Sequence, residues 1–104
     1  MIPRTIAKEL APMLSWFPVV SVTGPWQSGK SALVKTLLPH YEYVNLEDAA
    51  TRASATEDPV GFIRSHGSKL IIDEAQYAPD LFSQIQVEAD ERGTMGQYIL
   101  SGSQ

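Results

Sequence analysis

The sequence contains no cysteine, so neither a disulfide nor a thiolate zinc site can hold the fold together. Its two histidines, His40 and His66, have no spacing that indicates a shared metal site. No apolar stretch approaches the roughly 20 residues that a membrane-spanning helix needs. The N-terminus also lacks the charged start and apolar run of a signal peptide. We therefore expect a cytoplasmic protein without a membrane span.

Basic residues are scarce as well. Eight Lys and Arg stand against twelve Asp and Glu, which gives a formal net charge of −4. Nucleic-acid-binding modules draw much of their affinity from basic side chains that neutralise phosphates. Because the sequence has no run of basic residues, it does not indicate a nucleic-acid partner.

What is present is the composition of an ordinary globular domain. Hydrophobic residues make up 43% and charged residues 19% of 104 residues, which fits one domain over 1–104. Strands alternating with helices imply a parallel sheet covered on both faces, a three-layer α/β/α sandwich. Apolar spacing and turn residues predict strands over 17–23, 41–46, 70–72 and 98–100, helices over 4–16, 30–38, 58–67 and 79–92, and a short helix followed by a loop within 47–57.

Residues 24–31 match the phosphate-loop pattern G-x-x-x-x-G-K-[ST] in full. The glycines let the backbone turn tightly around a phosphate chain with its N–H groups pointing inward. Lys30 supplies a positive charge for the β- and γ-phosphates, and the Ser31 hydroxyl can coordinate Mg²⁺. The motif lies between a predicted strand and a predicted helix, as its function requires. The residues that we predict to bind nucleotide here are Gly24, Pro25, Trp26, Gln27, Ser28, Gly29, Lys30, Ser31 and Ala32.

A second acidic motif follows the strand 70–72, which ends in Asp73 and Glu74. Two solvated carboxylates are the alternative, since many strands end this way. Downstream of a phosphate loop, however, Asp73 can hold Mg²⁺ directly or through water, and Glu74 can polarise an attacking water as general base. A kinase has no need of this Glu, because its acceptor is the nucleophile. The pair favours hydrolysis, with Lys30 and Glu74 as catalytic residues and Ser31 and Asp73 as metal ligands.

Four segments, taken in chain order, carry a family resemblance. They are Val-Val-Ser-Val-Thr-Gly-Pro-Trp-Gln-Ser-Gly-Lys-Ser (19–31), Tyr-Val-Asn-Leu-Glu-Asp (43–48), Ile-Ile-Asp-Glu-Ala-Gln-Tyr-Ala-Pro-Asp-Leu (71–81) and Tyr-Ile-Leu-Ser-Gly-Ser-Gln (98–104). Together they resemble the bacterial and archaeal AAA+-like ATPases, in which this domain precedes a C-terminal nuclease-like domain. The resemblance covers nearly the whole chain. Segment 43–48 and Asp73-Glu74-Ala75-Gln76 with Pro79 are its more family-specific parts.

The resemblance implies a P-loop NTPase of the additional-strand class with strand order 2-3-4-1 and ATP as the nucleotide. Asp73 and Glu74 are then the Walker B pair. Ser101 or Ser103 is the polar group that senses the γ-phosphate, and we expect Ser103 to contact nucleotide; a simple turn is the alternative for Ser101–Ser103. Trp26 departs from the family, because relatives usually have Arg there. Trp26 offers no guanidinium to a phosphate or to a neighbouring subunit. It can stack on a base or cover the loop, and we favour the second.

The fifth strand, the lid helices and an arginine finger would lie beyond Gln104, so we expect the N-terminal part of a longer ATPase. The strand 17–23 would then be an apolar sheet edge that invites self-association. Hydrolysis should be slow, because a catalytic arginine is worth on the order of 10³ to 10⁵ in rate, and Arg52, Arg64 and Arg92 lie on predicted surface helices.

Three functions stay open at this point. The first is Mg²⁺-dependent ATP binding and hydrolysis as the ATPase module of a larger protein. The second is a nucleotide-binding switch without useful turnover, and the third is a P-loop phosphotransferase. The absence of an Asn-Lys-x-Asp motif agrees with a preference for ATP over GTP.

Overall fold

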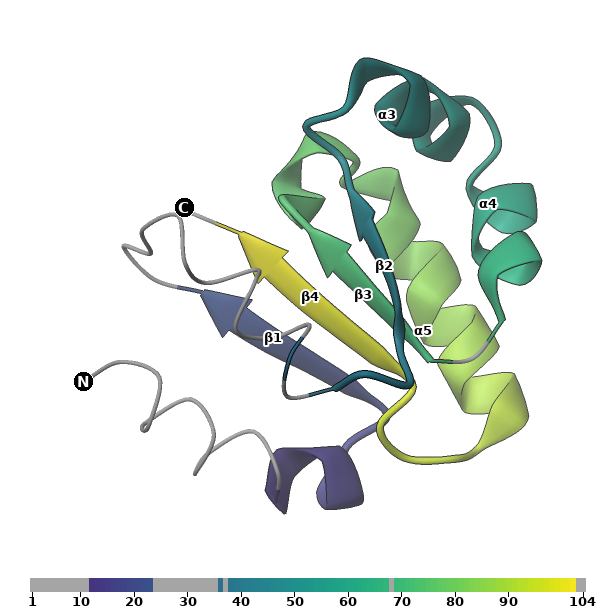
Figure 1. The fold of residues 1–104 in the computed structure, drawn as a ribbon. Coiled ribbons are helices and arrows are strands. Elements are labelled where there is room, and N and C mark those ends of the chain that lie inside the picture. Colours follow the sequence, from purple (N-terminus) through teal and green to yellow (C-terminus); the bar gives the residue numbers. More distant parts are fainter. Residues whose placement is uncertain (1–11, 24–35, 37, 68, 103–104) are drawn as a thin grey trace.

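The computed structural model describes residues 12–23, 36, 38–67 and 69–102 (Figure 1). A helical turn over residues 12–16 precedes the first strand. The elements that follow are β1 (Val19–Thr23), β2 (Glu42–Asn45), α3 (Ala49–Glu57), α4 (Pro59–His66), β3 (Leu70–Asp73), the 3₁₀ helix η1 (Ala75–Tyr77), α5 (Asp80–Arg92) and β4 (Tyr98–Gly102). The predicted alternation of strands and helices is therefore confirmed over the described part of the chain.

The sheet has the order β1-β4-β3-β2, and all three strand pairs are parallel. Read from the β2 edge, this is the 2-3-4-1 order that the family resemblance implies. β4 is the last strand in the sequence, yet it lies between β1 and β3 and pairs with both. β1 is consequently at one edge of the described sheet.

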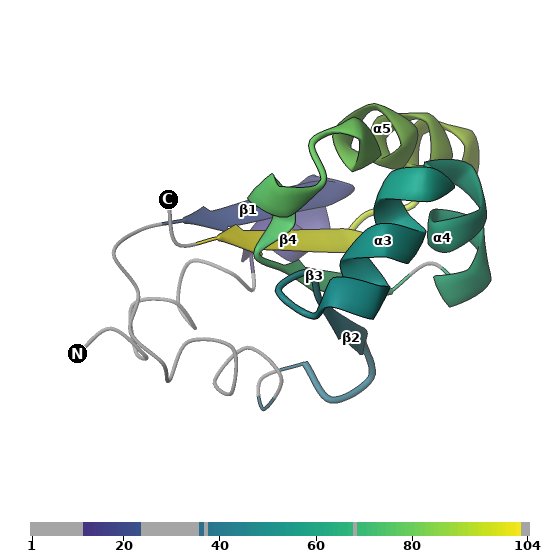
Figure 2. The same ribbon diagram turned by 90° about the horizontal axis from the view of Figure 1, so that it is seen from above.

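The central strands are buried on both of their faces. Every residue of β3 and β4 is buried, and their alternate side chains enter two different clusters. Leu70, Ile72 and Leu100 join the main core, which α3, α4 and α5 cover (Figure 2). Ile71 and Ile99 point to the opposite face, where Leu14, Val22, Leu38, Tyr41 and Tyr43 pack against them. Burial on both faces is what a parallel sheet requires.

Two aspartates set the bounds of α3 and α4. The Asp48 carboxylate accepts a hydrogen bond of 2.9 Å from the Thr51 N–H at the start of α3. Asp58 serves two helices, because its N–H donates to the Ser54 carbonyl at the end of α3 and its Oδ1 accepts from the Gly61 N–H at the start of α4. Proline at the first position of α4 suits a site that has no intrahelical partner for an N–H.

One local prediction is wrong, and one short element was not predicted. The segment 47–57 is not a short helix followed by a loop, since α3 continues to Glu57 and a single residue, Asp58, separates it from α4. The 3₁₀ helix η1 is absent from the prediction, because three residues are too few to show an apolar period. The predicted helices over 4–16 and 30–38 lie outside the described residues, except for 12–16, 36 and 38.

Candidate functional site

The carboxyl ends of the parallel strands meet at one edge of the sheet (Figure 1). In the strand register Asp73 at the end of β3 lies between Asn45 of β2 and Ser101 of β4. Thr23 at the end of β1 pairs with Gly102 of β4, and the phosphate-loop motif begins at the next residue. In open α/β sheets this edge is where ligands bind. The predicted nucleotide-binding residues 24–32 and Ser103 lie outside the described residues, so the structure describes the acidic side of the site.

Three donors hold the Asp73 carboxylate, which is only 4% exposed. Its Oδ1 accepts hydrogen bonds of 2.9 Å from the Ser101 hydroxyl and from the Glu74 N–H. Its Oδ2 accepts one of 2.6 Å from the Tyr43 hydroxyl. A carboxylate oxygen has two lone-pair directions, so Oδ2 retains one for a water or a cation. The group is a fixed anion at the end of a buried strand.

The Asp73 carboxylate is a suitable ligand for Mg²⁺. This ion prefers oxygen ligands and is usually held by one or two carboxylates together with substrate phosphates. Within the described part of the chain, no group of three or more His, Asp and Glu side chains could hold a metal by itself. A magnesium ion at this edge would therefore depend on Asp73, on the predicted ligand Ser31 and on the nucleotide.

Glu74 follows Asp73 with an unusual backbone. Its φ of 55° and ψ of 46° place it in the left-handed region, which costs a residue with a Cβ about 1–2 kcal/mol. This conformation turns the chain sharply out of β3 and into η1. The half-buried side chain accepts a hydrogen bond of 2.6 Å from the Gln76 amide. The predicted general base therefore lies beside the predicted metal ligand, and its orientation is restrained.

Ser101 is buried and its hydroxyl is directed at Asp73. In this arrangement the residue links β4 to β3 at the ligand-binding edge. The alternative interpretation of Ser101–Ser103 as a simple turn does not hold for Ser101, because β4 continues to Gly102. Ser103, the other sensor candidate, lies outside the described residues.

Sequence reasoning missed two residues of this site. Tyr43 pairs with Ile71 in the register of β2 and β3, so its phenol lies on the same face as Asp73 and reaches it diagonally. The two-residue period of a strand gives that face, but only the register between the strands reveals the contact. Gln76 belongs to the segment that carries the family resemblance, yet its contact with Glu74 depends on the left-handed turn between them.

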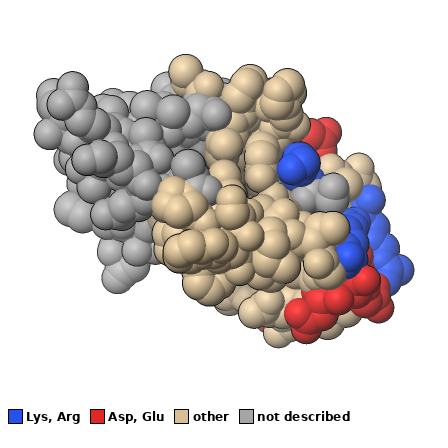
Figure 3. Space-filling view, turned by 90° about the horizontal axis from the view of Figure 1, so that it is seen from below, with Lys and Arg blue, Asp and Glu red and all other residues tan. Residues whose placement is uncertain are grey.

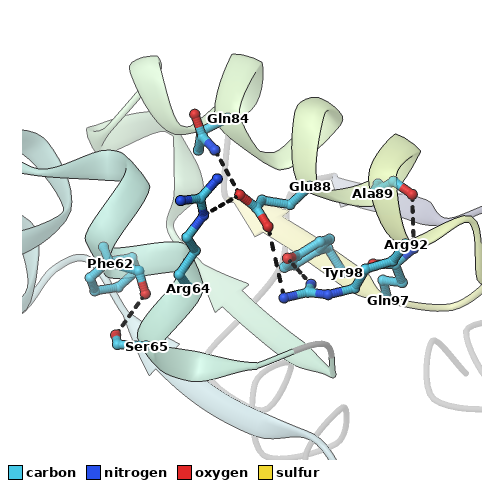
Figure 4. Close-up of polar contacts among 9 residues, drawn as sticks. All are labelled: Phe62, Arg64, Ser65, Gln84, Glu88, Ala89, Arg92, Gln97 and Tyr98. Atoms are coloured by element: carbon cyan, nitrogen blue, oxygen red, sulfur yellow. Dashed lines mark hydrogen bonds and ion pairs between the residues drawn. The ribbon is translucent and has the colours of Figure 1, made fainter.

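Each of the three arginines on the described helices contacts a neighbouring side chain, and the partners of Arg64 and Arg92 lie away from the Asp73 edge. Arg64 of α4 donates from Nε to Glu88 of α5 at 2.8 Å (Figure 4). Arg92 donates to the Tyr98 hydroxyl at 2.6 Å, and Tyr98 begins β4 at the opposite end of the strand from Ser101. Arg52 of α3 stacks over the Tyr77 ring at 4.9 Å. The prediction that these arginines lie on helices is confirmed.

Glu88 is the centre of the polar cluster in Figure 4. Its carboxylate, 6% exposed, also accepts from the Gln84 amide at 2.9 Å and lies 3.9 Å from the Arg92 guanidinium. The hydrogen bond from Arg64 lowers the pKa of Glu88 below its ordinary value, and the same bond raises the pKa of Arg64. This cluster joins α4, α5 and β4, and it has a structural role.

Charged side chains of both signs gather at one end of the face shown in Figure 3. Acidic and basic residues lie next to one another there, and no unbroken basic patch covers the described part of that face. The described helices include none that is long and apolar enough to cross a membrane.

The chain has relatives among known proteins. The uncharacterized proteins Mb2031c of Mycobacterium bovis and Rv2008c of Mycobacterium tuberculosis are each 34% identical to it over 105 residues. The alignment covers 96% of this chain, which spans 23% of the length of either relative. No solved structure gives a significant match. The family described as AAA domain matches residues 17–104, and with its parallel sheet and the placement of Asp73, the chain belongs to the AAA domain family.

Proposed function

We propose that this chain is a Mg²⁺-dependent ATP-binding and ATP-hydrolysing module of a larger protein. One observation carries the proposal: Asp73 is held by three donors at the carboxyl end of β3, at the edge where β1 runs into the phosphate-loop motif. The family suggests an ATPase-like function. The Asp-Glu pair supports hydrolysis over binding alone.

Each residue then has a defined role. The amides of the loop over 24–32 bind the phosphates, with Lys30 adjacent to the β- and γ-phosphates. Ser31 and Asp73 hold Mg²⁺, which when bound neutralises charge that develops on the phosphates. Glu74 accepts a proton from the attacking water as general base. Ser103, just after β4, contacts the nucleotide.

A switch that binds nucleotide without useful turnover, and a phosphotransferase, are the competing functions. Glu74→Gln separates them, because the change removes the general base and keeps the size of the side chain. Turnover should be lost and MgATP affinity kept if the chain hydrolyses ATP. In a switch the variant should behave like the wild type, and a phosphotransferase should deliver phosphate to an acceptor rather than to water.

The binding experiment titrates MgATP and MgGTP while the fluorescence of Trp16 and Trp26 is followed. We expect saturable binding with a preference for ATP. Lys30→Ala is the control and should abolish binding, because it removes the charge closest to the β- and γ-phosphates. Saturation by neither nucleotide, or the same affinity in Lys30→Ala, would refute the proposal.

We place the output of this module outside residues 1–104. The two relatives are about four times longer than the aligned segment, since that segment is 23% of their length. The family resemblance of the sequence implies a C-terminal nuclease-like domain in the longer protein, and the apolar β1 edge is the reason to expect self-association. Comparing ATP turnover by residues 1–104 with that of the longer protein tests this, and equal rates would count against it.

A further inference from the structure

The side chain of Gln76 bridges two strand ends at the candidate site. Its Nε2 donates a hydrogen bond of 2.6 Å to the Glu74 carboxylate, which follows β3. Its carbonyl Oε1 lies against Gly102, the last residue of β4. One amide group therefore contacts both the predicted general base and the neighbouring strand. The contact requires both strand ends to be in place.

Gly102 provides the room for this amide. A Cβ added to Gly102 would lie 2.5 Å from Gln76 Oε1, which is closer than atoms can pack. The backbone of Gly102 does not have a positive φ, so an alanine would fit the strand conformation. Since the atom in the way is the far end of a flexible side chain, an alanine would displace the Gln76 amide rather than distort β4.

Hydrogen bonds and buried neighbours fix the backbone around Gln76. η1 is closed by hydrogen bonds from the Tyr77 N–H to the Glu74 carbonyl and from the Ala78 N–H to the Ala75 carbonyl. Ala75 and Ala78 are buried in the main core. The Gln76 side chain, which is exposed, therefore starts from a fixed position, and its amide can hold Glu74 in one orientation.

We propose that Gln76 is a positioning residue for Glu74. The missing side chain of Gly102 lets the Gln76 amide pack against the end of β4. The inference rests on the proposed function, in which Glu74 is the general base. Gln76 does not touch the reacting atoms and acts through the orientation of the Glu74 carboxylate. β4 also pairs with β1, which leads into the phosphate-loop motif, so the orientation of the base depends on the strand next to that loop.

The kinetic test measures single-turnover ATP hydrolysis and MgATP affinity separately. Gln76→Ala should lower the hydrolysis rate roughly 10- to 100-fold, because a small misplacement of a catalytic group has an effect of that size. Its affinity for MgATP should stay at the wild-type value. In a Glu74→Gln background the same change should cause no further loss. An unchanged rate, or an equal loss of affinity and rate, would overturn the proposal.

Gly102→Ala provides an independent route to the same effect. It should lower the rate as Gln76→Ala does, since it pushes the amide away from Glu74. In a Gln76→Ala background it should have no effect, because the atom that it would meet is gone. A loss of the same size in both backgrounds would show that Gly102 acts through something other than Gln76.

The contact itself can be tested without hydrolysis. In ¹H–¹⁵N NMR spectra of the protein without nucleotide, Glu74→Ala and Gly102→Ala should each shift the side-chain amide resonances of Gln76. The amides of Gln84 and Gln97 bond elsewhere, to Glu88 and to the Ala89 carbonyl, and should stay in place. Unshifted Gln76 resonances would refute the positioning contact. If they shift but the wild type does not hydrolyse ATP, the proposed function has failed and not the contact.

Discussion

The hydroxyl of Tyr43 donates a hydrogen bond of 2.6 Å to Oδ2 of Asp73. The two residues lie on neighbouring strands, and the phenol crosses from β2 to the end of β3. Groups that hydrogen-bond to a metal ligand fix its orientation and tune its affinity for the metal. The position of Asp73 at the candidate site thus depends on β2 as well as on β3 and β4.

Tyr43→Phe tests this dependence, because it removes the hydroxyl and keeps the ring in the cluster with Ile71 and Ile99. We expect the free energy of unfolding to fall by about 1.5–3 kcal/mol, the usual value of a hydrogen bond to a charged group. The Mg²⁺ concentration needed for tight ATP binding should rise roughly 10-fold, as for other partners of metal ligands. Urea unfolding and ATP titrations at several Mg²⁺ concentrations measure the two effects.

Tyr77→Phe is the matched control for Tyr43→Phe. Tyr77 is exposed and its ring stacks with Arg52, a contact that phenylalanine preserves. Stability and Mg²⁺ dependence should both stay close to wild type in this variant. If the two variants behave alike, the Tyr43 hydroxyl has no special role at Asp73.

Ser101→Ala removes a different donor from the same carboxylate. Asp73 Oδ1 would then keep only the hydrogen bond from the Glu74 N–H. We expect the free energy of unfolding to fall by about 1–3 kcal/mol, because a buried carboxylate loses one of its hydrogen bonds. Because Ser101 and Tyr43 share Asp73, the double variant should not show the sum of the two single losses. Additive losses in urea unfolding would contradict a shared network around Asp73.

The fold could be predicted from the sequence because its local signals agree with one another. Apolar β-branched runs gave the four described strands, and the Asp58-Pro59 pair gave the start of α4. The length of α3 was missed because Asp58 caps both helices, which leaves no polar loop between them. A sequence pattern shows that a capping residue is present, but not that it serves two elements.

The candidate site was predictable only in part. The sequence predicts Asp73 and Glu74 as site residues, because an Asp-Glu pair at the end of a strand is visible in adjacent positions. Tyr43 is 30 residues away from Asp73, and the register that joins them is a property of the assembled sheet. Nor does the sequence indicate a positive φ at Glu74, because the left-handed region is unusual for glutamate. Contacts across strands and strained turns are what the structure adds.

The buried Glu88 predicts a dependence of stability on acid pH. Its pKa is lowered in the folded state, chiefly by the hydrogen bond from Arg64. The folded protein therefore binds a proton at this group less readily than the unfolded chain does, and the stabilisation is fully present above the ordinary glutamate pKa of about 4.3. As the pH falls below that value and through the folded pKa, the contribution is lost.

Glu88→Gln isolates this contribution, since glutamine has the same shape without the titrating charge. We expect the wild type to have the higher Tm at pH 7, and the difference between the two proteins to shrink below about pH 4.3. Thermal unfolding of both proteins from pH 7 to pH 3 provides the measurement. Asp90→Asn, on the exposed side of α5, is the control and should leave the profile nearly unchanged. A difference in Tm that does not vary with pH would contradict the role assigned to the Arg64 bond.

The β1 edge predicts self-association of this chain. A shallow groove of about 220 Å³ beside β1 is lined by Val19, Ser21, Phe82, Ile85, Gln86 and Leu100, and Phe82 is 42% exposed. An exposed edge strand with apolar surroundings can pair with another chain, and a lysine on the edge opposes such pairing.

Ser21→Lys should therefore lower the mean mass in light scattering at high protein concentration, whereas Ser83→Lys on the exposed side of α5 should not. A wild-type protein that stays monomeric over the whole concentration range would refute association through β1, and an equal effect of both lysines would indicate a general change in charge rather than a blocked edge.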